Sequence, residues 1–282
     1  MDDNGNGGAV GRGRVVVGTD GSDNSMKAVL WAAHEAAVRH RPLVVVYGTQ
    51  IIIDVTREVL DKAVARVEKE YPEVPATPML IMATAAESLV ETAGDDDLLV
   101  VGSRGLGGFN ALLLGSVGLR VAARSRVPVV VVRGTGDEAE RPGAPVVAAV
   151  RDDGDRAALY FAAEAAKLRA VPLHVVSVWK FLQNVGSMAT TADDVNQVAR
   201  GEREATSRLV TPVREDFAGL DITEETVRAT SVAGTLVEMS GRAVLLVMGA
   251  RRPRNRLGSP LGYVTHTLLQ HSACPVTVIP RV

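Results

Sequence analysis

The sequence has one cysteine, few aromatic residues and no long apolar run, and these shortages narrow what the protein can be. Cys274 is the single cysteine among 282 residues, so no intrachain disulfide framework can form, which suits a reducing cytoplasm. No apolar run approaches the roughly 18–20 residues that a membrane-spanning helix needs. A formal net charge of −2 gives no reason to expect DNA or a membrane surface as a partner. We therefore expect a soluble, cytoplasmic protein.

Several catalytic motifs are missing as well. The sequence holds no P-loop lysine motif, no H-E-x-x-H zinc motif and no G-x-S-x-G nucleophile elbow. Its five histidines fall on expected helices or in an expected strand, and none accompanies a candidate nucleophile. Without a placed base or a lysine at a phosphate, fast phosphoryl transfer has little chemical basis. The sequence favours binding over catalysis.

What is present is concentrated between Leu98 and Arg133. An apolar run ends at Gly102, a glycine-rich segment follows, and a helix is expected to begin near Gly115 and Ser116 before a second apolar run at 129–132. Strand, loop, helix and strand in this order are typical of a parallel α/β sheet. Ser116 is placed to cap the helix, whose free N–H groups and positive dipole end favour an anion. This stretch predicts a cradle for a nucleotide phosphate.

The flanking patterns extend this unit into a complete domain. The expected strands cover 15–17, 43–47, 78–82, 98–101 and 129–132, and the expected helices cover 25–40, 56–71, 85–93 and a stretch from 115. Alternating strands and helices imply right-handed crossovers and a doubly wound sheet. In such a sheet a ligand sits at the carboxyl ends of the strands, where the strand order reverses.

The whole pattern then starts again. Expected strands at 145–150, 172–176, 223–228, 243–249 and 274–279 accompany expected helices at 156–170, 195–217 and 262–271. Three residues, Gly102, Gly115 and Pro128, recur 147 positions later as Gly249, Gly262 and Pro275. We infer a tandem duplication: a flexible tail at 1–13, a first domain at 14–133, a linker at 134–144 and a second domain at 145–282. The apolar run at 129–132 needs a neighbour, so the second domain is expected to act as a pseudo-dimer partner, and a homodimer of the chain stays open.

The spaced glycines at 102, 105 and 115, followed by Ser116 and a Val-Pro-Val strand, resemble the ATP-binding signature of the universal stress protein family. The opening Val-Gly-Thr-Asp-Gly-Ser at 17–22 fits the same family. The resemblance covers residues 14–282. It implies two tandem Rossmann-like domains, similar to adenine nucleotide alpha hydrolases, with strand order 3-2-1-4-5. It also implies ATP as the ligand, with Mg²⁺.

The resemblance assigns roles to particular residues. The family's acidic residue that contacts the nucleoside falls on Asp20, which can accept hydrogen bonds from ribose hydroxyls or hold magnesium through water. The backbone that meets the adenine falls near Gly48. The expected phosphate contacts form two groups, namely Gly102, Ser103, Arg104 and Gly105, and Gly115, Ser116 and Val117. The small residues expected after strand three fall on 83–85, which are alanine and threonine where glycine and proline are more usual.

The second copy is altered at the same positions. Arg252 stands at the counterpart of Gly105, and Tyr263 at that of Ser116. Arg151 stands at the counterpart of Asp20, and the adjacent Asp152 is the alternative. We expect this copy to have lost ordinary ATP binding. The alternatives are a loop shift that uses Gly258 and Ser259, or a new anion site built from Arg251, Arg252, Arg254 and Arg256.

Other features have plainer interpretations beside the functional ones. Asp20 also suits a turn before Gly21, and Arg104 also suits a solvated loop. The run 95–97 of three aspartates is expected to be a solvated turn, and Cys274 to be buried and inert. Three functions remain: an ATP-binding regulatory module that hydrolyses ATP slowly at most, a scaffold that ignores nucleotide, and a slow adenine-nucleotide hydrolase or transferase.

Overall fold

The computed structural model describes residues 13–51, 54–103, 115–133, 141–180, 192–250 and 261–281. The first half alternates strands and helices as the sequence predicts, and its elements are β1 (Val15–Gly18), α1 (Asp23–Arg39), β2 (Leu43–Gly48), α2 (Asp54–Glu70), β3 (Ala76–Ile81), α3 (Ala85–Thr92), β4 (Leu98–Gly102), α4 (Ser116–Arg124) and β5 (Val129–Val132). No helix in these ranges is long and apolar enough to cross a membrane.

The second half repeats this order. Its elements are β6 (Val146–Ala149), the 3-10 turn η2 (Asp153–Asp155), α5 (Arg156–Arg169), β7 (Leu173–Trp179), α6 (Ala192–Asp216), β8 (Ile222–Arg228), α7 (Val232–Ser240), β9 (Leu245–Ala250), α8 (Tyr263–His271) and β10 (Val276–Pro280). Helix α7 is missing from the expectations above. It has nine residues with Gly234 inside, so its apolar period is short, and the Ser231 hydroxyl caps it by accepting the Gly234 N–H at 3.1 Å.

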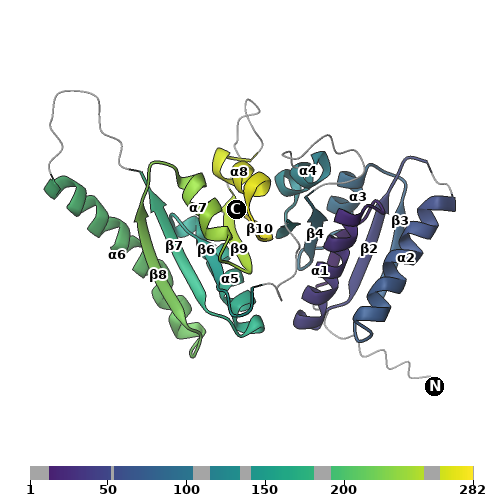
Figure 1. Cartoon of the computed structure of the whole chain (residues 1–282), viewed down its shortest axis with the longest axis horizontal. Coiled ribbons are helices and arrows are strands. Elements are labelled where there is room, and N and C mark those ends of the chain that lie inside the picture. Colours follow the sequence, from purple (N-terminus) through teal and green to yellow (C-terminus); the bar gives the residue numbers. More distant parts are fainter. Residues whose placement is uncertain are drawn as a thin grey trace, which may run out of the picture.

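The ten strands in the described ranges form one sheet in the order β3-β2-β1-β4-β5-β10-β9-β6-β7-β8. Each half is parallel within itself and follows the predicted order 3-2-1-4-5. The halves meet where β5 and β10 pair antiparallel, with Val131 opposite Val276 and Val129 opposite Val278. The buried run at 129–132 thus has the neighbour that the sequence predicts for it. Figure 1 shows the halves side by side, with β3 and β8 at opposite ends of the sheet.

Helices cover both faces of this sheet. One buried cluster joins α1, α2, α5 and α6 to one face, and a second joins α3, α4, α7 and α8 to the other. Strand residues alternate between the clusters, as Val15 and Val16 do, because successive side chains point to opposite faces. Cys274 lies in the second cluster, where burial raises the pKa of its thiol to about 12. Its predicted burial is confirmed, and the raised pKa disfavours the reactive thiolate.

Ion pairs of a buried carboxylate also link the two halves. Glu35 on α1 is fully buried, accepts from the Arg39 Nε at 2.5 Å and is ion-paired with Arg169 on α5. Arg39 reaches Glu164 on α5 as well, at 2.9 Å. Burial by itself would raise the pKa of Glu35, but Arg169 and Arg39 outweigh it and lower that pKa to about 2. Glu35 is therefore held as a carboxylate between an arginine of its own half and one of the other half.

Candidate functional site

The predicted site lies at the carboxyl ends of β1, β2 and β4. Strand β1 sits between the other two, because Gly18 pairs with Val46 of β2 and Val17 with Val100 of β4. The chain leaving β1 turns into α1, whereas the chain leaving β4 continues toward α4 on the opposite face. This divergence of neighbouring connections is the arrangement at which open α/β sheets bind ligands.

Asp20 lies just beyond the end of β1 and is half-buried. Its Oδ1 accepts the Ser22 N–H at 3.0 Å and the Ser22 hydroxyl at 2.6 Å. The Asp20 N–H in turn donates to the Ser25 hydroxyl at 3.3 Å. The structure therefore gives Asp20 the turn-forming role that the sequence allows, and this turn fixes the carboxylate beside the strand ends. A turn role and a ligand role are compatible, since a carboxylate has two oxygens with about four acceptor sites.

Gly48 ends β2 against the first turn of α3. A Cβ at this position would lie 2.5 Å from the Ser88 Oγ and 2.7 Å from the Ala85 Cα. The absence of a side chain at Gly48 is therefore required by packing between strand and helix, whatever binds there. The sequence suggested Gly48 as a backbone contact for adenine. The packing requirement could not be predicted from the sequence, because it depends on where α3 lies.

The second group of predicted residues is held together by the backbone. The Ser103 N–H donates to the Val132 carbonyl at 3.0 Å, and the Gly115 N–H donates to the Ser103 carbonyl at 2.9 Å. These bonds bring the start of α4 to the end of β4, so Gly102, Ser103 and Gly115 lie together. Two residues predicted for the same contacts, Arg104 and Gly105, lie outside the described residues.

Ser116 is not the cap of α4, contrary to the sequence-based expectation. Gly115 occupies the N-cap position with extended backbone angles (φ −59°, ψ 146°), and Ser116 is the first helical residue. The Gly115 carbonyl accepts the Leu119 N–H at 3.2 Å, so the helix begins one residue earlier than a Ser116 cap would require. A glycine cap offers no side-chain oxygen to the first-turn N–H groups, and those of Ser116 and Val117 face the same helix end.

Comparison with known proteins fits this arrangement. The family model described as "Universal stress protein family" matches residues 11–133 and again 144–280. The chain belongs to the universal stress protein family. A universal stress protein of Mycobacterium tuberculosis is 28% identical over 290 residues, which cover 94% of this chain and 96% of that protein.

Solved structures include one with the same fold over nearly the whole chain. A universal stress protein from Archaeoglobus fulgidus covers 95% of this chain and 98% of its own, with a TM-score of 0.64 and 19% identity, and this likeness concerns the fold. Another universal stress protein from that organism, solved in complex with dAMP, is 27% identical, covers 49% of this chain and 98% of its own, and has a TM-score of 0.34.

The second universal stress protein unit carries different residues at the positions that match the site of the first. Arg151 takes the place of Asp20 and is ion-paired with Asp152 at 3.3 Å. Tyr263 is the first residue of α8, after the cap Gly262, and 73% of its surface is exposed. The arginines predicted to form an alternative anion site, at 251, 252, 254 and 256, lie outside the described residues, as do Gly258 and Ser259.

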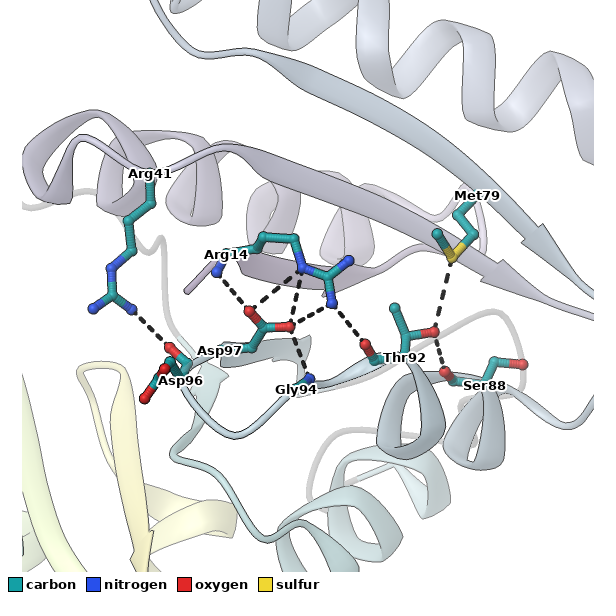
Figure 2. Close-up of polar contacts among 8 residues, drawn as sticks. All are labelled: Arg14, Arg41, Met79, Ser88, Thr92, Gly94, Asp96 and Asp97. Atoms are coloured by element: carbon teal, nitrogen blue, oxygen red, sulfur yellow. Dashed lines mark hydrogen bonds and ion pairs between the residues drawn. The ribbon is translucent and has the colours of Figure 1, made fainter. Parts of the chain in front are cut away.

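The aspartate run at 95–97 lies at the opposite edge of the sheet, and its last member corrects an expectation. Asp97 is buried, not solvated, and binds Arg14 through the backbone N–H at 2.5 Å and the Nη2 at 2.6 Å. Figure 2 shows its carboxylate between Arg14 and Gly94, with Arg14 also donating to the Thr92 carbonyl. Burial would raise the pKa of Asp97, but the hydrogen bonds from Arg14 and Gly94 outweigh it and lower that pKa. The cluster joins the amino ends of β1 and β4.

Proposed function

We propose that this universal stress protein binds ATP, together with Mg²⁺, at the carboxyl-end crevice of its first half and acts as a regulatory module. The observation that carries the proposal is the bond between Gly115 and Ser103, which sets the amino end of α4 beside β4, next to the β1 end that carries Asp20. An anion site and a hydroxyl-binding carboxylate then stand on adjacent strands, as a nucleotide requires.

Each part of the ligand has a proposed partner. The backbone N–H groups of Ser116 and Val117, with the Ser116 hydroxyl, donate to the phosphates at the positive end of α4. Asp20 accepts from the ribose hydroxyls or holds Mg²⁺ through water. The backbone near Gly48 meets the adenine. Hydrogen bonds to charged groups of this kind contribute about 1.5–3 kcal/mol each.

The regulatory role follows from what bound ATP can do here. The sequence places no lysine of the P-loop kind at the phosphates, so hydrolysis is expected to be slow. Bound nucleotide instead shifts the population between conformations around α4, and a partner protein in the cytoplasm responds to the favoured one. Such a role in the response to stress needs binding energy and no turnover.

The test is a calorimetric titration of the full chain with ATP and Mg²⁺. The Asp20→Asn variant keeps an oxygen for the Ser22 bonds but loses the charge, so affinity should fall about tenfold, which corresponds to about 1.4 kcal/mol. The control is Asp23→Asn, which removes the same charge from an exposed position in the same turn and should change affinity less than about twofold.

Two outcomes would favour the other functions. No heat and no uptake of ATP at millimolar concentration would favour the nucleotide-independent scaffold. Chromatography can show whether an excess of the protein converts ATP to another nucleotide. Such conversion in wild type, and its loss in Asp20→Asn, would favour the hydrolase or transferase.

A further inference from the structure

An internal ion pair lies at the carboxyl ends of the second half's strands. Arg281, which follows β10, donates from Nε to the Asp155 Oδ1 at 2.8 Å, and its Nη2 is ion-paired with the other oxygen of Asp155. Its Nη1 binds the Asp152 Oδ1 at 3.1 Å. Only 3% of Asp155 and 10% of the Arg281 side chain are exposed. The pair is therefore a packed part of the fold.

The position of this pair corresponds to the nucleotide crevice of the first half. Asp155 stands at the start of α5 and accepts the Arg151 N–H at 2.8 Å, just beyond the end of β6. The Arg281 N–H donates to the Ala250 carbonyl at the end of β9. The guanidinium thus reaches from β10 across the end of β9 to the loop after β6. Strands β9 and β6 are the counterparts of β4 and β1.

Gly249 shows how closely the pair fills this space. It is the counterpart of Gly102, and a Cβ on it would lie 2.9 Å from the Arg281 Nε and closer still to the Asp155 Oδ1. The ion pair therefore leaves no room for a side chain at residue 249 of the second half. In the first half the proposed function uses the matching glycine, Gly102, for close approach of the ligand.

The first half carries smaller residues at the matching positions. Ser25 precedes Asp155 by 130 positions and has the same backbone partner, since it accepts the N–H of Asp20 as Asp155 accepts that of Arg151. Gly134 precedes Arg281 by 147 positions, the offset of the other matched glycines. A hydroxyl and a glycine have thus been replaced by a carboxylate and an arginine that bind each other.

We propose that Asp155 and Arg281 form a blocking pair that closes the second crevice, so that each chain takes up one nucleotide, in its first half. This inference rests on the proposed function. The guanidinium is already matched by Asp152 and Asp155, so it offers little to a phosphate, and the two carboxylates repel one. Tyr263, the replacement noted in the sequence, is exposed and does not fill the crevice.

Equilibrium dialysis of the full chain against labelled ATP and Mg²⁺ tests the block. The wild-type chain should bind one ATP. Gly115→Asp, which puts a carboxylate at the proposed phosphate position of the first half, should bind ATP at least fivefold more weakly. Adding Asp155→Ser and Arg281→Gly to Gly115→Asp gives the second crevice the residues of the first. The affinity for ATP should then be at least tenfold higher than in Gly115→Asp alone. The matched control adds Asp153→Ser and Arg156→Ala, which removes an exposed ion pair from the same loop and should restore nothing.

The outcomes separate the block from the proposed function. Two ATP per wild-type chain would overturn the block and leave nucleotide binding standing. The block would also be overturned if the Asp155 and Arg281 changes did not raise the affinity for ATP in a chain whose circular dichroism matches wild type. No uptake by wild type, with a gain in the unblocked chain, would support the block and refute the proposed function. If the unblocked chain does not fold, the wild-type stoichiometry decides alone.

Discussion

Placing a carboxylate at residue 115 should separate nucleotide binding from folding. Gly115 is the N-cap of α4, and its angles (φ −59°, ψ 146°) are open to any L residue. Aspartate is a preferred N-cap, and its charge is favourable at the positive end of a helix. Gly115→Asp should therefore fold at least as well as wild type, while its carboxylate takes the place proposed for the phosphates.

The size of the two effects can be worked out. The better cap and the helix dipole together should stabilise the fold by a few tenths to about 1 kcal/mol. Two unit negative charges about 4 Å apart repel by roughly 1 kcal/mol in water and roughly 4 kcal/mol at an effective dielectric constant of 20. Affinity for ATP should therefore fall by between about fivefold and about a thousandfold, at about 1.4 kcal/mol per factor of ten.

The assay is calorimetric titration with ATP alongside thermal unfolding, and the second half supplies the control. Gly262 is the N-cap of α8 with nearly the same angles (φ −56°, ψ 158°), and a Cβ there would meet no atom within 4 Å. Gly262→Asp should raise stability similarly and leave the affinity for ATP unchanged. Unchanged affinity in Gly115→Asp, or equal losses in both variants, would refute the reasoning.

Two further predictions concern buried carboxylates. Glu35→Gln should cost about 3 kcal/mol of unfolding free energy at pH 7, because Arg39 and Arg169 lose their partner, whereas the exposed Glu68→Gln should cost little. Since the folded pKa of Glu35 is about 2, below the ordinary 4.5, its contribution is complete above pH 4.5 and is lost as pH falls toward 2; urea unfolding across that window should show this loss in wild type and not in Glu35→Gln. Asp97→Asn should cost about 2 kcal/mol through its weakened bonds to Arg14, and an equal loss in the exposed Asp95→Asn would contradict this role.

Much of the fold could be predicted from the sequence because its cause is local or repeated. Buried parallel strands appear as continuous apolar runs such as 98–101 and 129–132, and the offset of 147 positions between glycines reveals the duplication. The strand order of the first half and the family were both predicted and are confirmed. The domain boundaries and the site residues remain predictions.

The features that sequence reasoning missed depend on partners far apart in the chain. Asp97 looked solvated because it stands in a run of three aspartates, and only the fold brings Arg14 to it across 83 positions. The blocking pair joins residues 126 positions apart, so no spacing rule could find it. A comparison of the two halves, of Ser25 with Asp155 and of Gly134 with Arg281, is the sequence signal that could have found it.

In the proposed function, the amino end of α4 in the first half holds the phosphates of ATP. Backbone amide NMR of the full chain, recorded as ATP and Mg²⁺ are added, tests it most directly. The amide signals of Ser103, Ser116 and Val117 should shift, while those of Tyr263 and Val264 at the matching end of α8 should stay in place. No shift at millimolar ATP, or shifts confined to α8, would contradict it.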